Sequence, residues 1–200
     1  MRTRLAIATI LAAMGLGPTA WAHDAGDWIV RTGFHSIQPK SRNHALVEVE
    51  DQTGLTFNVT YMFAPNWGVE LLGALPFSHE ITLNGAGVVA EANQLPPTLS
   101  AQYHFNPNGR VRPYVGAGLN YTFFFDERTY GALLGTKLEL EPSFGPAAQL
   151  GVDVDFDSSW FINIDARWFD IDADAKLDGA DLGAVEIDPY AFGISVGYRF

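Results

Sequence analysis

The sequence predicts an all-β protein, an eight-stranded antiparallel transmembrane β-barrel with four long extracellular loops and three short periplasmic turns. Three observations predict this fold class: apolar and polar residues alternate, long and short connections alternate, and an export signal stands at the N-terminus. The alternation is clearest at the C-terminus, where residues 190–200 read YAFGISVGYRF. Large apolar residues on one face and small or polar residues on the other are typical of a strand with lipid on one side.

The N-terminal segment has the pattern of a secretory signal. Two arginines precede an apolar run at residues 5–16, and residues 20–22 read AWA, an A-x-A cleavage site. The apolar run is shorter than the ~20 residues of a membrane-spanning helix. We therefore predict a signal peptide over residues 1–22, followed by a single outer-membrane barrel domain over residues 23–200.

Composition narrows the range of partners. The chain carries a net charge of −11, which argues against nucleic acid as a partner. It contains no cysteine, so an exported protein of this sequence has no disulfides to stabilise it.

Eight segments alternate in this way, and they span residues 28–37, 53–63, 67–77, 95–105, 112–125, 144–156, 160–171 and 190–200. In the first four, the apolar face is formed in turn by Val30 and Phe34; Leu55, Phe57 and Val59; Val69 and Leu71; and Leu99 and Tyr103. In the last four it is formed by Val115, Leu119 and Tyr121; Leu150 and Val152; Ile162 and Ile164; and Phe192, Ile194 and Val196. Period-2 alternation of this length indicates strands rather than helices.

The connections between these segments are of two kinds. Three are tight turns with the letters APN at 64–66, NPNG at 106–109 and DSS at 157–159. Four are long, at residues 38–52, 78–94, 126–143 and 172–187. Because long and short connections alternate, the termini and tight turns lie at one end and the long loops at the other, as in outer-membrane barrels.

A soluble barrel of lipocalin type is the alternative to a membrane barrel, since it shares the up-and-down order of strands. Such a barrel would bury its apolar face and expose its charges. Tryptophan and tyrosine recur near the strand ends, at Trp28, Trp67, Tyr103, Trp160, Tyr190 and Tyr198. Aromatic girdles of this kind mark the two interfaces of a bilayer, and they favour the membrane barrel.

Several segments resemble the OmpW/AlkL family of small outer-membrane proteins. They are GVELL at 68–72 with PF at 76–77, LPPTL at 95–99, RPYVGAGLNY at 112–121, GPAAQLGVD at 145–153, DID at 170–172 and GYRF at 197–200. The resemblance runs in order through the predicted barrel domain. It implies an eight-stranded barrel with a narrow apolar channel, through which small hydrophobic molecules pass before they leave sideways into the membrane.

The inward faces of the predicted strands change character along the barrel. Arg31, Glu70, Asp153, Asp165 and Arg167 point inward, and we expect these opposite charges to pair and plug the periplasmic half. An eight-stranded barrel has an interior that side chains just fill, so it is not a wide aqueous pore. Towards the outer end, we predict a channel lined by Leu72, Ala74, Phe124, Arg167, Phe169 and Ile171. The resemblance implies an aromatic residue in place of Arg167, so this chain should have a more polar channel floor.

Prolines at the outer ends of two neighbouring strands predict a lateral opening. Proline lacks the N–H that a β-ladder needs, so it occurs at edges and interruptions of a sheet. Pro76 ends one predicted strand, and Pro96 and Pro97 begin the next. We predict a gap in the wall at these three residues; the alternative is that they only terminate strands.

Motifs for other chemistry fail on inspection, and we predict no catalytic residues, no cofactor and no metal site. The aspartates from Asp170 to Asp181 resemble a calcium loop, but Ala175 and Asp181 occupy the positions that need glycine and glutamate. The alternative for this acidic loop is a looser contact with a divalent ion that bridges to lipopolysaccharide. Ser100 and His104 share a strand face but stand about 13 Å apart, too far for a nucleophile and its base. The five histidines lack the sequence spacing of a metal site.

The sequence therefore predicts a protein of the outer membrane that acts as a passive conduit for small hydrophobic molecules, and not an enzyme. The alternatives are a structural or adhesive barrel whose loops bind phage or bacteriocins, and a lipid-modifying enzyme. Expected partners are outer-membrane lipid and lipopolysaccharide, a small hydrophobic solute, and the outer-membrane assembly machinery, which would read the strand ending in Phe200. The oligomeric state is left open.

Overall fold

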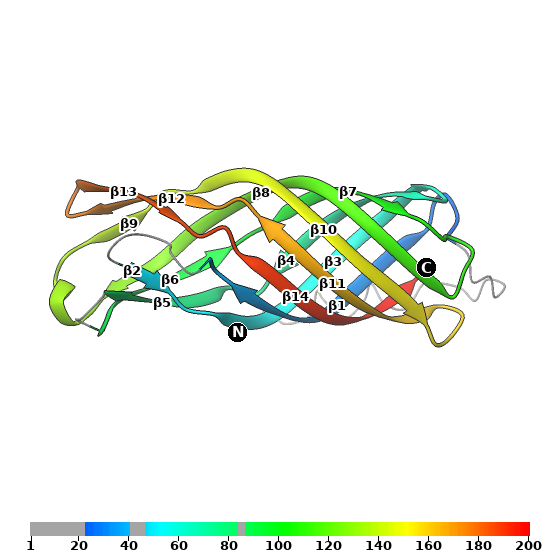
Figure 1. The fold of residues 1–200 in the computed structure, drawn as a ribbon, viewed down its shortest axis with the longest axis horizontal. Helices are drawn as coiled ribbons and strands as arrows, with labels where there is room; N and C mark the ends of the chain where they lie inside the picture. Colours follow the sequence, from blue (N-terminus) through cyan, green and yellow to red (C-terminus); the bar gives the residue numbers. More distant parts are fainter. Residues whose placement is uncertain (1–22, 41–46, 84–86) are drawn as a thin grey trace, which may run out of the picture.

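The predicted barrel forms. The computed structural model describes residues 23–40, 47–83 and 87–200, so the predicted signal peptide lies outside the described residues. The eight wall strands are β1 (Trp28–Gln38), β3 (Gln52–Ala64), β4 (Trp67–Ala74), β7 (Thr98–His104), β8 (Val111–Thr129), β10 (Ser143–Asp155), β11 (Trp160–Phe169) and β14 (Tyr190–Arg199). All neighbours are antiparallel, and the ring closes through the β1–β14, β8–β10 and β11–β14 ladders (Figure 1).

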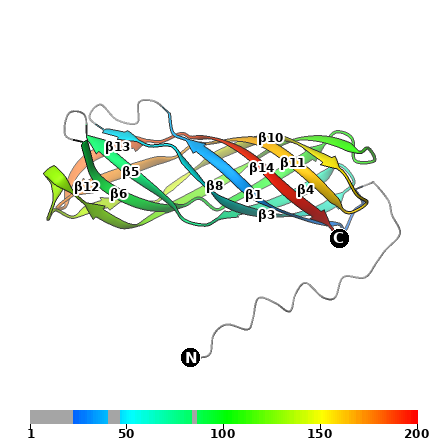
Figure 2. The ribbon, with the colours of Figure 1, turned by 90° about the horizontal axis from the view of Figure 1, so that it is seen from below.

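The two ends of the barrel differ as the connections predict. The three tight turns, β3–β4, β7–β8 and β10–β11, lie at the same end as the C-terminus, whereas the long connections lie at the other (Figures 1 and 2). We call these the periplasmic end and the outer end.

The long connections are not irregular loops, and this is the main correction to the sequence prediction. A hairpin of β5 (Phe77–Leu83) and β6 (Gly87–Leu95) continues the wall outward, with β2 (Val47–Val49) beside β5 and with β6 beside the upper part of β8. A separate sheet contains β9 (Leu138–Leu140), β12 (Asp172–Leu177) and β13 (Ala180–Glu186), and a short 3₁₀ helix, η1 (Gly131–Leu133), precedes it.

Two strand ends were predicted wrongly for the same reason. The strand expected to reach residue 77 ends at Ala74, and the strand expected to start at residue 95 starts at Thr98. Prolines 76, 96 and 97 interrupt the ladder because none of them can donate a backbone hydrogen bond. The residues beyond each interruption belong to the β5–β6 hairpin instead.

The outer surface of the wall is apolar. Large side chains in the middle of the strands are exposed, among them Phe34 at 60%, Leu71 at 57% and Ile194 at 58%. In the described part of the chain, no helix has the length and apolar character needed to cross a membrane.

Pairs of tryptophan and tyrosine ring the periplasmic end of this surface. Each pair joins directly opposed residues of neighbouring strands: Trp28 with Tyr61, Trp67 with Tyr103, and Trp160 with Tyr198. The ring centroids of the three pairs are 5.0, 5.0 and 4.8 Å apart. Such a girdle is characteristic of the membrane–water interface.

Large and small residues alternate across the interior. The ring of Tyr114 lies over Gly151, where an added Cβ would come within 2.5 Å of it, and the ring of Phe161 lies over Gly197, at 2.1 Å. Inward glycines therefore provide the space that the large inward rings of adjacent strands occupy. The lumen is filled by side chains, as expected for eight strands.

A candidate solute pocket above a charged floor

Ion pairs fill the periplasmic half of the lumen. The guanidinium of Arg31 donates two hydrogen bonds to the carboxylate of Asp153, at 2.7 and 3.2 Å. The guanidinium of Arg167 lies 2.7 Å from Glu70 and 2.7 Å from Asp165. All five side chains are buried and come from four different strands, so the charges pair across the lumen.

Further polar side chains complete this network, which we call the charged floor. Gln102 and Gln149 donate to the two carboxylate oxygens of Glu70, at 2.9 and 3.1 Å. His35 lies 3.1 Å from Asp165 through Nε2 and 2.7 Å from the hydroxyl of Thr56 through Nδ1. Buried charges are tolerated only when they are paired and hydrogen-bonded, and this condition is met here.

An apolar layer lies above the charged floor. Its buried members are Ile37, Leu72, Phe77, Ala147, Phe169, Ile171, Ile187 and Ala191, with Ala74, Phe124 and Val185 packed against them. This layer separates the ion pairs from the outer part of the lumen.

The outer end of the barrel contains an apolar pocket with a volume of about 240 Å³. It is lined by the wall strand β8, by six outer strands (β2, β5, β6, β9, β12 and β13), by η1, and by Ile187 after β13. Apolar side chains dominate its lining: Val49, Ile81, Leu83, Val89, Ala90, Ala92, Phe124, Leu133, Leu138, Leu140, Ala173, Ala175, Leu177, Leu182, Val185 and Ile187. Pockets lined in this way exclude water and suit apolar ligands.

Two polar side chains line the pocket, His79 and Gln94, and they satisfy each other. The Gln94 amide donates to His79 Nε2 at 2.9 Å, so the proton of the imidazole is on Nδ1 and is donated to the carbonyl of Glu50 at 3.0 Å. Both ring nitrogens are therefore occupied, and the pair presents little polarity to a bound solute.

The structure distributes the predicted channel-lining residues over three levels. Phe124 lines the pocket itself. Leu72, Phe169 and Ile171 are buried in the apolar layer below it, with Ala74 packed against them. Arg167 lies lower still, in the charged floor. Their role as a channel lining stays a prediction.

Most of the pocket lining was missed because it comes from segments predicted to be loops. A signal was present in the sequence, where residues 171–175 read IDADA, an alternation of apolar and acidic residues. In the structure Asp172 and Asp174 are exposed between buried apolar residues, as this alternation indicates. The aspartates of this segment also give it its resemblance to a calcium loop. In the structure they lead into and form a β-hairpin, and the carboxylates of Asp170, Asp172 and Asp188 lie near one another at the outer end.

The prolines predicted to open the wall lie at an interruption of the ladder. Pairing of β4 with β7 stops at Leu72–Thr98 and resumes between β5 and β6 at Phe77–Gln94. Within the described chain, no ladder pair joins residues 73–76 to residues 95–97. Pro76 is exposed and Pro96 is buried. That the wall opens at this interruption stays a prediction.

The other side of this interruption is held firmly. The side-chain amide of Asn120 donates to the carbonyls of Pro96 and Pro97, at 3.3 and 3.4 Å, and to the hydroxyl of Thr98 at 2.9 Å. The backbone N–H of Tyr121 also donates to Pro97, at 3.0 Å. The diproline segment is thus fastened to β8 and not to the segment between β4 and β5.

Comparisons with known proteins agree with this architecture. The model of the OmpW family matches residues 24–200. Outer membrane protein W of Escherichia coli is 40% identical over 212 residues, covering 98% of this chain and 99% of that protein. Outer membrane protein AlkL of Ectopseudomonas oleovorans is 28% identical, covering 98% and 96%.

A solved structure supports the same assignment. The crystal structure of the outer membrane protein OprG from Pseudomonas aeruginosa superposes with a TM-score of 0.82 at 34% identity, covering 90% of this chain and 99% of that one. The fold, the apolar outer surface and the similarity along the whole barrel lead to one conclusion: this chain is an outer-membrane β-barrel protein and belongs to the OmpW family.

Proposed function

We propose that the protein is a passive conduit for small hydrophobic molecules, which enter the apolar pocket at the outer end and leave sideways through the wall. The observation that carries this proposal is the combination of the pocket with the charged floor beneath it. A solute without charges or hydrogen-bonding groups fits the pocket lining. It could cross the charged floor only by separating buried ion pairs, which is costly.

The interruption at the three prolines supports the lateral route. It lies between the β4–β7 ladder and the β5–β6 ladder, at the level where the apolar layer meets the pocket. Leu72 and Phe77, which flank it, both belong to the apolar layer. Opening the wall there breaks no ladder hydrogen bond, because none spans the interruption. No step of this route requires catalysis.

Uptake of an alkane or a terpene by cells with and without the protein tests the proposal. Replacing Ala92 and Ala175 by phenylalanine would fill the pocket, because both side chains line it. We expect the double variant to lower uptake to the level of cells without the protein. Ala101→Phe is the matched control, because Ala101 faces outward and makes no part of the pocket.

The same experiment separates the conduit from a barrel that acts only through its loops. If uptake is equal with and without the protein, at equal amounts in the outer membrane, the conduit is rejected and a docking or structural role remains. The amount of protein in purified outer membranes is therefore measured for every variant.

We further propose the route by which the chain reaches its membrane. Residues 1–22 direct export and are removed, and the assembly machinery recognises β14 with its terminal Phe200, whose backbone N–H donates to Trp28 at 2.9 Å. Contact of the outer-end strands with lipopolysaccharide is part of the same proposal.

A further inference from the structure

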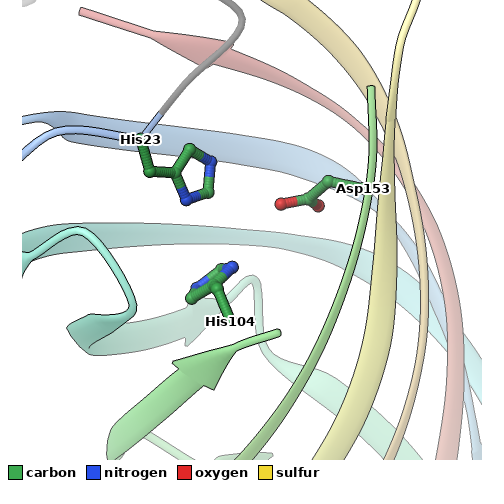
Figure 3. A group of neighbouring side chains, drawn as sticks. All are labelled: His23, His104 and Asp153. Atoms are coloured by element: carbon green, nitrogen blue, oxygen red, sulfur yellow. The ribbon is translucent and has the colours of Figure 1, made fainter. Parts of the chain in front are cut away.

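Three potential metal ligands meet at the periplasmic end, far from the pocket. His23 precedes β1, His104 is the last residue of β7, and Asp153 belongs to β10 (Figure 3). All three residues have 0% exposure. Their ligand atoms lie within 4.8 Å of one another, and the centroids of the two imidazoles are 4.8 Å apart.

Hydrogen bonds fix which nitrogen of His104 is free. Gln102 donates its amide N–H to Glu70, so its carbonyl oxygen is the atom that faces His104 Nε2, at 3.2 Å. A carbonyl can only accept, so Nε2 carries the proton and Nδ1 keeps a lone pair. Nδ1 has no hydrogen-bond partner among the described residues.

His23 lacks more hydrogen bonds than His104 does. Neither ring nitrogen has a hydrogen-bond partner within the described part of the chain, although the ring is fully buried. A buried polar atom without a partner costs about 1–3 kcal/mol, so such atoms require an explanation.

Asp153 supplies the negative charge. Its carboxylate is held in place by Arg31 at 2.7 Å and by the side-chain amide of Asn163 at 2.8 Å. A carboxylate offers about four lone-pair sites, so one remains for a further partner. The neighbouring Arg112 is itself paired with Asp155.

We propose that His23, His104 and Asp153 bind a zinc ion, which fastens the beginning of the barrel domain to β7 and β10. Two imidazoles and one carboxylate, with water as the fourth ligand, form a set that zinc accepts. Zinc ligands stand about 2.0–2.2 Å from the ion, so rotation of the side chains must bring the donor atoms somewhat closer together.

The surroundings have the features of a metal site. The His104–Gln102–Glu70 chain orients the imidazole in the way that outer hydrogen-bond partners orient zinc-bound histidines. The main-chain nitrogen of His23, which becomes the α-amino group once residues 1–22 are removed, donates to the carbonyl of Pro107 at 2.8 Å and holds this residue over the β7–β8 turn. Because Arg31 and Arg112 oppose an added positive charge, we expect micromolar rather than picomolar affinity.

Calorimetric titration tests the proposal. The protein is purified without a histidine tag from outer membranes into detergent, freed of metal with a chelator, and titrated with zinc chloride. We expect one zinc ion per barrel and a higher unfolding temperature by circular dichroism when zinc is present. His23→Gln and His104→Gln should each weaken binding more than tenfold.

His79→Gln is the matched control, because His79 lies in the pocket at the opposite end. It should bind zinc as the unchanged protein does. The absence of a zinc-binding isotherm for the unchanged protein would overturn the proposal, as would equal affinity in the His104→Gln variant; ordered water would then be the partner of the imidazoles.

A spectroscopic measurement on the unchanged protein guards against variants that fail to fold. Cobalt(II) added to the metal-free protein should give visible absorption bands of a four-coordinate site, and zinc should displace them. Cobalt(II) that stays six-coordinate, with the spectrum of the aqueous ion, would reject the site without any variant.

Discussion

Glu70 holds the charged floor together. Its carboxylate receives hydrogen bonds from Arg167, Gln102 and Gln149, and it lies 3.6 Å from Arg31. Removing this one charge would leave two guanidiniums short of a counter-charge inside the barrel. Exchanging the Glu70 carboxylate for an amide should therefore have a large effect on the stability of the barrel.

We expect Glu70→Gln to lower the free energy of unfolding by about 3–5 kcal/mol, the usual cost of breaking a buried ion pair. The measurement is urea unfolding of the barrel in lipid vesicles. Glu141→Gln is the control, because Glu141 pairs with Lys176 on the surface, and it should leave the unfolding curve unchanged. Equal unfolding curves for both variants would contradict this role of the floor.

A second prediction at this scale concerns the fit of Tyr114 over Gly151. The added methyl group of Gly151→Ala would meet the ring at 2.5 Å and displace the tyrosine hydroxyl, which receives a hydrogen bond from Asn163 at 3.1 Å. We expect a loss of about 1–3 kcal/mol. A double-mutant cycle with Tyr114→Leu checks the cause: in that background Gly151→Ala should cost little, and an unchanged cost would point to the backbone.

At the scale of elements, the diproline segment between β6 and β7 determines where the wall is interrupted. Replacing Pro96 and Pro97 by valine would restore two backbone N–H groups. Residue 97 faces β8, where its carbonyl accepts from Tyr121, so in a continued strand the N–H of residue 96 would face residues 73–76. We expect the β4–β7 ladder to extend and the uptake of an alkane to fall. Unchanged uptake, with the barrel present in normal amounts, would show that the prolines only terminate strands.

Pro107→Val is a suitable control for that prediction. Pro107 lies in the tight turn between β7 and β8, at the periplasmic end and away from the pocket and the interruption. This variant also exchanges proline for valine, but it should leave the uptake of the alkane unchanged. A similar loss of uptake in the Pro107→Val variant would mean that the uptake assay reports the stability of the barrel and not the interruption of the wall.

The wall strands could be predicted from sequence, whereas the outer strands could not, and the reason is physical. A strand such as β14 has lipid on one side and the lumen on the other, so its residues alternate between two very different surroundings. β5 and β6 rise beyond the main wall, and β13 is mostly exposed on both faces, so their sequences show weaker contrast. The pocket is built largely from these segments and was therefore missed.

At the scale of the whole molecule, the exposed apolar side chains form a belt around the wall, and this belt requires a lipid bilayer as its surroundings. Leu99, the second residue of β7, pairs with Leu119 near the middle of the long strand β8, while Val111 starts β8 beside the periplasmic turn. The side chains of Leu99 and Val111 both face outward. We expect Leu99→Arg to destabilise the barrel in lipid vesicles by about 2–4 kcal/mol and Val111→Arg by about 0–1 kcal/mol, because the cost of a charge depends on its depth.

Reversible urea titration of folding into vesicles measures both values. Equal costs at the two positions would mean that the centre of the bilayer does not lie at the height of Leu99.

The proposed metal site could not be predicted from sequence. His23 and His104 are far apart in the chain, and only closure of the ring brings them together. Spacing rules for metal sites apply to ligands on one element, so they cannot detect such a pair.

The charged floor also has a consequence for the cell that carries this protein. A wide porin admits every small polar compound, so its abundance must be weighed against the entry of toxins. Here the lower lumen is occupied by paired charged side chains, so a polar compound could pass only by separating buried ion pairs. We therefore expect additional copies of this barrel to add little to the permeability of the envelope for hydrophilic compounds.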